Sequence, residues 1–284
     1  MAEPQPHEQQ SHEQQSHEQQ SHEQQSHEQQ SHEQQSHEQR RSVLRPHGPR
    51  PHDDHPPYRY ADYRSTVLRS PDADMVRIVQ SLSEITGPGP AFAQVSAEDA
   101  DLTTNAGTGE EAIGARTIVT GRVLDEAGEG VPETLVEIWQ ANACGRYTHW
   151  REVDFPAPLD PNFLGIGQCR TDAGGSYRFL TIRPGPYPWG NHPNAWRPAH
   201  IHFSLMGPSL GSRLVTQMYF PDDPLLAMDP MYQSVPPHAR ERLLATYDHD
   251  VTTENWATGW RFDIVLRGRR VTPFERDDVE AVQR

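Results

Sequence analysis

Short runs of alternating apolar and polar residues, separated by Gly, Pro and Asp, recur along the second half of the chain. Alternation with a period of two is typical of a strand that buries one of its faces. The runs are 117–124, 134–139, 176–182, 200–205, 213–220 and 260–267. Because they do not alternate with helical segments, the pattern predicts an all-β fold with an antiparallel β-sandwich core and long loops.

Two segments have the periodicity of a helix. Residues 75–86 place apolar side chains three or four positions apart, and residues 237–247 do the same through Ala239, Leu243, Leu244 and Tyr247. We therefore expect one or two short helices beside the sandwich. Residues 58–115 are interpreted as an N-terminal arm followed by turn-rich loops, and residues 116–284 as the sandwich domain.

The first 57 residues differ in composition from the rest of the chain. The pentad His-Glu-Gln-Gln-Ser repeats six times from His7 to Ser36 and begins again at His37. An Arg-, Pro- and His-rich stretch follows, to about Pro57. A tract without apolar residues buries nothing that would offset its ordering entropy, so we expect residues 1–57 to be a disordered low-complexity tail.

Charge and cysteine usage narrow the classes of function. The formal net charge is -15, without a basic stripe, which disfavours nucleic acid as a partner. No run of about 18 apolar residues and no signal-peptide pattern occurs, so we expect no membrane association and no export. Cys144 and Cys169 lack the Cys-x-x-Cys spacing of a zinc site and suit a reducing, cytoplasmic location.

The strand predicted at 200–205 carries the strongest candidate chemistry. His200 and His202 are two positions apart, so both imidazoles lie on one face of the strand. Tyr187 precedes them between two prolines, in a proline-rich loop that loses little entropy when it is fixed. One phenol and two imidazoles are a set of three metal ligands, and Arg197 lies three positions before the first histidine. The sequence therefore predicts a metal site.

These residues alone leave two rival interpretations open. A cupin-like barrel or an iron(II) oxygenase would use the same His-x-His strand, but it needs a carboxylate ligand. No Asp or Glu occurs between His202 and Asp222. A non-enzymatic sandwich that binds a ring or a sugar with its aromatic residues would need no metal. Metal analysis separates the metal sites from the metal-free sandwich, and a visible spectrum separates a tyrosine-ligated metal from a carboxylate-ligated one.

Longer motifs resemble those of the intradiol ring-cleaving dioxygenases. They are the stretches 134–143, 145–147, 157–163, 183–189 and 196–203. More narrowly, the arm at 62–71 and the segment 262–268 are similar to those of the β subunits of protocatechuate 3,4-dioxygenases. The resemblance extends from about Tyr58 to Glu275 and does not include the pentad repeats.

The resemblance implies a cofactor and a set of site residues. A non-haem iron(III) ion, Fe(3+), would be bound by Tyr147, Tyr187, His200 and His202. Tyr187 would also accept a proton as the substrate binds, Arg197 would stabilise the anionic ring, and Gln217 would orient the substrate or oxygen. The residues that would line the substrate pocket are Tyr63, Trp139, Trp189 and Met231.

The resemblance also implies a reaction and a partner. The reaction is the cleavage of protocatechuate (3,4-dihydroxybenzoate) by O2 to 3-carboxy-cis,cis-muconate, in aromatic catabolism by the β-ketoadipate pathway. Catechol and hydroxyquinol dioxygenases share the four metal ligands, so these substrates remain alternatives. The partner would be a homologous α subunit that completes the pocket within a hetero-oligomer.

Overall fold

The computed structural model describes residues 54–57, 59–70, 95–149, 156–207 and 213–274. The chain divides into two compact units, residues 1–49 and 50–284, and everything described below belongs to the second. The expected disordered tail, apart from residues 54–57, and the helix expected at 75–86 lie outside the described residues.

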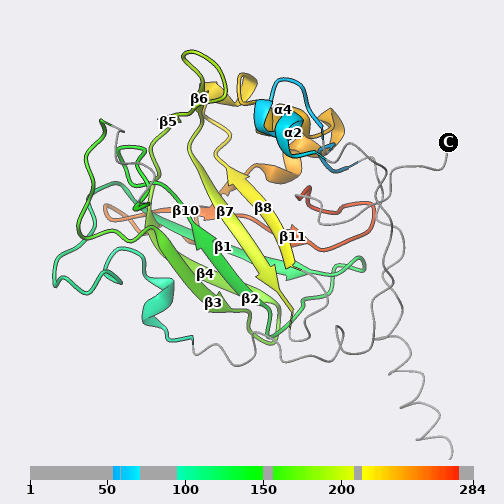
Figure 1. Ribbon diagram of the computed structural model, residues 1–284. Coiled ribbons are helices and arrows are strands. Elements are labelled where there is room, and N and C mark those ends of the chain that lie inside the picture. The colour runs from blue at the N-terminus through cyan, green and yellow to red at the C-terminus, as the bar shows by residue number, and fades with distance from the viewer. Residues whose placement is uncertain (1–53, 58, 71–94, 150–155, 208–212, 275–284) are drawn as a thin grey trace, which may run out of the picture. The chain divides into compact units, whose positions relative to one another are not determined.

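The strands of the described residues form two sheets and one short hairpin (Figure 1). The first sheet contains β1 (Arg116–Leu124), β4 (Ser176–Ile182), β9 (Thr246–Tyr247), β10 (Thr258–Arg261) and β11 (Ile264–Val265). The second has the order β3 (Ile166–Arg170), β2 (Leu135–Trp139), β7 (His200–Met206), β8 (Arg213–Tyr219). The hairpin pairs β5 (Tyr187–Pro188) with β6 (Trp196–Arg197).

The core lies between the two sheets because their strands alternate. In β7, Ile201 and Phe203 are fully buried in the core, whereas His200 and His202 belong to the opposite face. The ring of Phe203 lies 5.2 Å from that of Phe262, which joins β10 to β11. Burying a side chain of this size is worth about 1.5–3 kcal/mol. The core therefore fixes which face of β7 presents the histidines.

The predicted antiparallel sandwich is confirmed, with one local exception. Within the two sheets, five strand pairs among the described residues are antiparallel, but β1 pairs with β10 and β11 in parallel. The strand expected at 260–267 is divided, because the Asp263 side chain accepts the hydrogen bond from the Arg122 backbone N–H at 2.9 Å. The sequence reading also missed β3 and the β5–β6 hairpin.

Short helices cover one end of the second sheet and part of its flank (Figure 1). They are α2 (Arg64–Arg69), α4 (Pro230–Ser234) and the 3-10 helices η2 (Glu98–Ala100), η4 (Pro224–Ala227) and η5 (Pro237–Leu243). Among the described residues, no helix has the length and apolar character needed to cross a membrane.

The single amphipathic helix predicted at 237–247 is wrong. The helical part is η5, a 3-10 helix that ends at Leu243, and the chain then becomes extended and forms β9 against β10. The reason is competition from the sheet, because the Ala245 N–H donates to the Tyr219 carbonyl at 2.8 Å. A backbone partner in the sheet thus replaces the next helical hydrogen bond.

Candidate metal centre and its pocket

The register of the second sheet gathers the candidate residues. His202 in β7 is paired with Trp139 in β2 and with Gln217 in β8, while His200 is paired with Tyr219. The indole of Trp139 stacks on the imidazole of His202 with 4.7 Å between ring centroids and 5° between planes. Since paired residues on adjacent strands share a face, this register places Gln217 beside the histidine pair.

A hydrogen bond to the backbone fixes the orientation of His200. Nδ1 of His200 lies 2.7 Å from the Pro198 carbonyl oxygen, which only accepts, so Nδ1 carries the proton. Nε2 of His200 is therefore the acceptor nitrogen of the ring, and it lies 3.1 Å from Nε2 of His202. A backbone carbonyl that holds the far nitrogen of a histidine is the usual support of a metal-ligating imidazole.

Both imidazoles are kept neutral by their surroundings. Burial, reinforced by the positive charge of Arg197, lowers the pKa of His200 well below its usual range. The same two causes, in the same order, lower the pKa of His202 to about 3. A neutral imidazole is the form that binds a metal ion, so the pair is prepared for ligation at any physiological pH.

Tyr187 reaches the histidine pair from the β5–β6 hairpin. Its hydroxyl lies 3.4 Å from Nε2 of His200, and the two rings are 5.6 Å apart. In the hairpin Tyr187 is paired with Arg197, so one short element delivers both the phenol and the guanidinium. The prolines that surround Tyr187 limit the backbone freedom of this segment.

Tyr147 arrives from a loop that follows β2. The Asn142 side chain shapes this loop by accepting from the backbone N–H groups of Cys144 and Arg146 at 2.9 and 3.0 Å. Gly145 adopts a positive φ of 78°, and a Cβ there would collide with the Pro186 carbonyl. The glycine thus lets the two tyrosine loops touch, with the Tyr147 ring 5.4 Å from that of Tyr187.

The donor set suits a hard, highly charged metal ion. Within the described residues, no group of three or more His, Cys, Asp and Glu side chains is arranged to hold a metal. The oxygen donors next to the histidine pair are phenols instead, and phenolate is a known ligand of ferric iron. Four residues from three segments of the chain therefore form a set that fits iron(III): Tyr147, Tyr187, His200 and His202.

Arg197 is buried directly beside this set and is 2% exposed. Its Nη1 donates to Nε2 of His200 at 3.0 Å, and its Nη2 donates to Oε1 of Gln217 at 2.7 Å. Nη2 also forms an ion pair with Oδ2 of Asp229 at 3.1 Å. Burial alone would lower the pKa of Arg197, but the Asp229 carboxylate raises it well above its ordinary value, so the guanidinium stays charged.

Two members of this network were missed from the sequence. Asp229 is fully buried and caps α4, accepting from the Met231 N–H at 3.3 Å. The Asp-Pro dipeptide at 229–230 is a helix-start signal that would have located it. The Tyr219 hydroxyl donates to Gln217 Oε1 at 2.9 Å, and burial, followed by the Asp229 charge, raises the pKa of Tyr219 well above its usual value.

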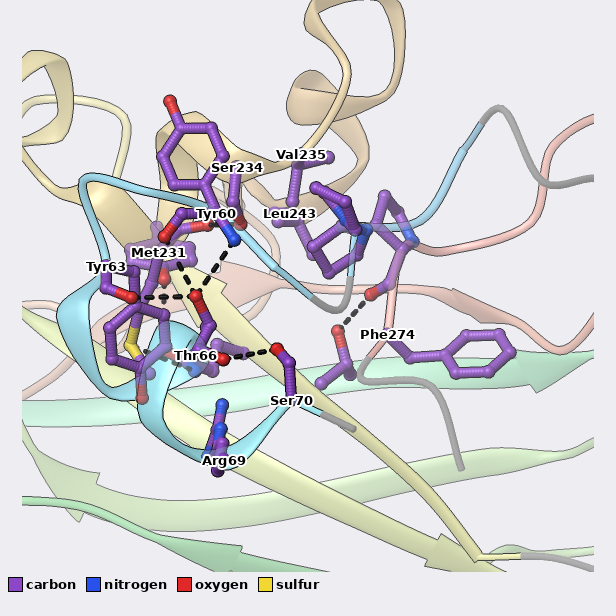
Figure 2. Close-up of a pocket in the computed structure, with 16 residues that line it drawn as sticks. Tyr60, Tyr63, Thr66, Arg69, Ser70, Met231, Ser234, Val235, Leu243 and Phe274 are labelled. Atoms are coloured by element: carbon purple, nitrogen blue, oxygen red, sulfur yellow. Dashed lines mark hydrogen bonds between the residues drawn. The ribbon is translucent and has the colours of Figure 1, made fainter. Parts of the chain in front are cut away.

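A pocket of about 480 Å³ opens next to this network (Figure 2). It lies between the arm, β8, α4 and residues 273–274. Of the predicted lining residues, Tyr63 and Met231 face this pocket together with Gln217. The sulfur of Met231 lies 3.9 Å from Nε2 of Gln217. Gln217 Oε1 accepts two hydrogen bonds, and one amide N–H donates to the Met231 sulfur, so the second N–H is left for the pocket side.

The other two predicted lining residues, both tryptophans, are not among the residues that line this pocket. Trp139 stacks on His202 as described above. Trp189 lies between the ring of Tyr63, at 5.2 Å, and the guanidinium of Arg197, at 5.7 Å. The indole of Trp189 thus separates the arm from the buried arginine.

Two family models match the chain. The model described as dioxygenase matches residues 87–268, and the model described as protocatechuate 3,4-dioxygenase beta subunit N terminal matches residues 49–81. The first match includes the sandwich and all four candidate metal ligands. The second includes the described part of the arm with Tyr63.

Individual relatives agree with these matches. The protocatechuate 3,4-dioxygenase beta chain of Burkholderia cepacia is 58% identical over 214 residues, which are 75% of this chain and 90% of that protein. The chlorocatechol 1,2-dioxygenase of Rhodococcus opacus is 30% identical over 155 residues, 50% of this chain and 56% of that protein. The crystal structure of 3-chlorocatechol 1,2-dioxygenase from Rhodococcus opacus 1CP aligns with a TM-score of 0.47 and 26% identity, covering 61% of this chain and 66% of that chain.

Proposed function

We propose, since this chain belongs to the intradiol ring-cleaving dioxygenases, that it is the catalytic β subunit of an enzyme that cleaves protocatechuate with O2. The substrate assignment rests on the 58% identity to a protocatechuate 3,4-dioxygenase beta chain, which extends over 90% of that protein. The product would be 3-carboxy-cis,cis-muconate, which places the enzyme in aromatic catabolism by the β-ketoadipate pathway.

The metal of this proposal is a non-haem iron(III) ion. Tyr147, Tyr187, His200 and His202 would hold it, because two phenolates and two neutral imidazoles offset part of its charge and satisfy its preference for hard donors. When bound there, iron(III) would accept both oxygens of a catechol and withdraw electron density from its ring. The closeness of the phenol and the two imidazoles supports this assignment, since the Tyr187 hydroxyl lies 3.4 Å from Nε2 of His200 and the two Nε2 atoms lie 3.1 Å apart.

The chain's own residues would prepare the substrate. The hydroxyl oxygen of Tyr187 lies 3.4 Å from Nε2 of His200 and, as a phenolate, would accept a proton from a catechol hydroxyl. Arg197 would face negative charge that develops on the ring, in a site where burial strengthens the attraction. Gln217 would donate an amide N–H to a substrate or oxygen atom, because its carbonyl is already engaged by Arg197 and Tyr219.

The proposal also includes a partner and a location. We infer a homologous α subunit because the Burkholderia cepacia relative is named as a beta chain. Four large apolar side chains exposed by between 42% and 71% support a partner surface: Ile113, Leu159, Leu164 and Ile166. A cytosolic location is supported by the two cysteines, both of which are free.

A visible spectrum tests the proposal directly. The protein is purified with its α subunit, and protocatechuate is added without oxygen. We expect a visible absorption band from phenolate bound to iron(III), and a shift of that band as the substrate binds. Admission of O2 should then convert protocatechuate to the muconate. A protein that contains iron but has no visible band would contradict the tyrosine ligands, and preferential cleavage of catechol would contradict the substrate.

A further inference from the structure

We propose that Asp54 is a positioning residue, which holds one wall of the pocket in place and thereby sets how tightly the pocket binds the ring of the substrate. This inference rests on the proposed function, because that function supplies the aromatic ligand. Asp54 does not line the pocket itself. It acts through three segments of the chain that meet beside the pocket, namely residues 54–57, η5 and residues 271–274.

The carboxylate of Asp54 is bound by two basic side chains of η5. Asp54 is 6% exposed, and its Oδ1 lies 2.9 Å from Nε2 of His238 and 3.0 Å from Nη2 of Arg242. Because a carboxylate oxygen accepts, Nε2 of His238 carries the proton. The guanidinium of Arg242 extends the contact, since its Nη1 donates to the Val271 carbonyl at 2.7 Å. One guanidinium thus ties the first described segment of the chain to the last.

The same three segments build one wall of the pocket, which we call the distal wall. In each segment, residues that come shortly after a member of this contact line the pocket. Figure 2 shows Phe274 at the end of the pocket away from Tyr63. The contact between Asp54 and Arg242 therefore lies directly beside the wall on all three segments. The lining residues of the distal wall are Pro56, Pro57, Leu243, Pro273 and Phe274.

Side-chain contacts, rather than a sheet, hold the distal wall. Residues 54–57 and 271–274 belong to no helix or strand of the described structure, and the prolines of the wall have no N–H to donate. The Phe274 N–H donates to Nδ1 of His55 at 3.3 Å, and the rings of these two residues lie 4.2 Å apart. Both residues belong to segments that the Asp54 contact joins. Loss of that contact should therefore loosen the wall and leave the two sheets intact.

The opposite end of the pocket has its own attachment. Asn191, in the turn of the β5–β6 hairpin, accepts from the Arg64 N–H at 2.7 Å and donates to the Asp62 carbonyl at 2.5 Å. The buried Thr66 hydroxyl donates within the arm, where the Tyr63 carbonyl lies at 2.7 Å. The part of the arm that carries Tyr63 is thus held independently of Asp54.

A small movement of the distal wall is enough to change affinity. Dispersion attraction falls steeply with distance, and a gap of about 0.5–1 Å forfeits about a quarter to a half of it. Apolar walls supply most of the contact area in a pocket for a small ligand. A wall that is held loosely therefore binds a ring more weakly, although no group that touches the ring has been replaced.

The test uses variants of the full chain with its α subunit. Asp54→Asn removes the charge at nearly constant shape, Asp54→Glu keeps the charge, and Arg242→Gln removes the partner. Asp248→Asn is the matched control, because its side chain is 11% exposed against 9% for Asp54. Asp248 is likewise bound by an arginine, Arg261 at 2.6 Å, but it does not line the pocket.

Four properties are measured for each variant. Anaerobic equilibrium dialysis gives the dissociation constant for protocatechuate, and steady-state kinetics gives KM and kcat. Thermal denaturation gives Tm. Hydrogen–deuterium exchange reports the protection of the backbone amides in residues 271–274 and needs neither substrate nor turnover.

We expect Asp54→Asn to raise the dissociation constant and KM by about fivefold to tenfold and to change kcat by less than about twofold, because the wall contacts the ring before and during the reaction alike. Exchange in residues 271–274 should accelerate. Asp248→Asn should lower Tm by about 2–4 °C, as Asp54→Asn does, and leave both constants unchanged.

The remaining variants test whether the effect passes through the proposed contact. Asp54→Glu should restore part of the binding. The double variant Asp54→Asn/Arg242→Gln should bind no more weakly than the weaker of the two single variants, because both changes break the same contact and their effects are then not additive.

Three outcomes would overturn the inference. Equal affinity of the wild type and Asp54→Asn for protocatechuate would remove it while leaving the proposed function intact. An equal loss of affinity in Asp54→Asn and Asp248→Asn would show a general effect of lost stability. Unchanged exchange in residues 271–274 of Asp54→Asn would show that Asp54 does not hold the wall. A wild-type enzyme that does not bind protocatechuate would instead overturn the proposed substrate, and with it the ligand assumed here.

Discussion

The buried region around Arg197 and the exposed region around Arg69 hold the same chemical group in opposite ways. Arg197 is 2% exposed and donates to His200, Gln217 and Asp229, so its position is fixed before any ligand arrives. Arg69 is exposed and contacts a single aromatic ring. A fixed charge suits the stabilisation of charge that develops during a reaction, whereas a free charge suits reversible recognition.

The difference in burial between the two arginines also predicts different effects of substitution on folding stability and on ligand affinity. Removing one partner of a buried ion pair leaves the other charge uncompensated, which costs about 3–5 kcal/mol. An exposed charged group contributes about 0–1 kcal/mol to folding. Substitutions in the buried region should therefore change folding and turnover together, and substitutions in the exposed region should change ligand binding alone.

The largest effect is expected for Arg197→Met. It should reduce turnover at least about 100-fold, by loss of a preorganised charge, and it should destabilise the fold by about 3–5 kcal/mol because Asp229 is left buried without a counter-charge. The double variant Arg197→Met/Asp229→Asn should regain most of the stability, since no net charge is then buried, and none of the turnover. Urea denaturation and steady-state kinetics measure the two properties. Recovery of turnover in the double variant would mean that Arg197 serves the fold rather than the reaction.

A smaller effect is expected for Gln217→Leu. This change removes the acceptor shared by Arg197 and Tyr219 as well as the amide N–H groups on the pocket side. Loss of a buried hydrogen-bond partner costs about 1–3 kcal/mol, so turnover should fall roughly tenfold or more, with a modest loss of stability. Thr216→Val is the control, because Thr216 is the neighbouring residue on β8 and its hydroxyl bonds the Pro273 carbonyl instead. Equal turnover of Gln217→Leu and wild type would contradict the assigned role.

Removal of a surface ion pair should have little effect on the stability of the fold. Arg183 donates to Asp222 at 2.7 Å, and this hydrogen bond lowers the pKa of Asp222 below its ordinary value. A carboxylate whose pKa is lowered on folding stabilises the protein above its unfolded pKa, and the contribution is lost as the pH falls through the folded pKa. Because the Asp222 side chain is 64% exposed, Asp222→Asn should destabilise the fold by no more than about 1 kcal/mol at pH 7. The difference should vanish at strongly acid pH in denaturation curves, and its persistence there would contradict an electrostatic origin.

The smallest effect is expected for deletion of residues 1–40, which contain the pentad repeats. The tract has no apolar residue to bury, and the proposed site lies wholly between Tyr63 and Met231. Turnover and affinity for protocatechuate should equal those of the full chain in steady-state assays. A large loss of turnover would show that the repeats serve the enzyme in a way that their composition does not suggest.

Period-two alternation was sufficient to predict the sandwich and the shared face of His200 and His202. It could not predict the sheet register, which brings Gln217 beside His202, because pairing depends on contacts between distant strands. The helix predicted at 237–247 failed for a related reason, since a backbone partner from β8 ends it. Local pattern thus predicted the elements better than it predicted their partners.

The residues of the candidate site also differ in whether local sequence pattern could predict them. Tyr187 was placed by its proline-rich loop, and the structure brings it to the histidine pair. Tyr147 came from family resemblance alone, because an irregular loop has no periodicity that orients a side chain. Asp229 was missed, since nothing in the sequence links it to Arg197, 32 positions away. The ligand roles themselves remain predictions.

The docking of the arm on the β5–β6 hairpin has a consequence for engineering. The arm and the sandwich match separate family models, with a boundary between residues 81 and 87. The Asn191 side chain bonds two backbone atoms of the arm, and the Arg64 side chain adds a longer bond to the Asn191 carbonyl at 3.4 Å. An arm of different sequence can therefore form the same backbone hydrogen bonds to Asn191. Exchanging this segment between related enzymes should therefore keep these two backbone contacts to the hairpin.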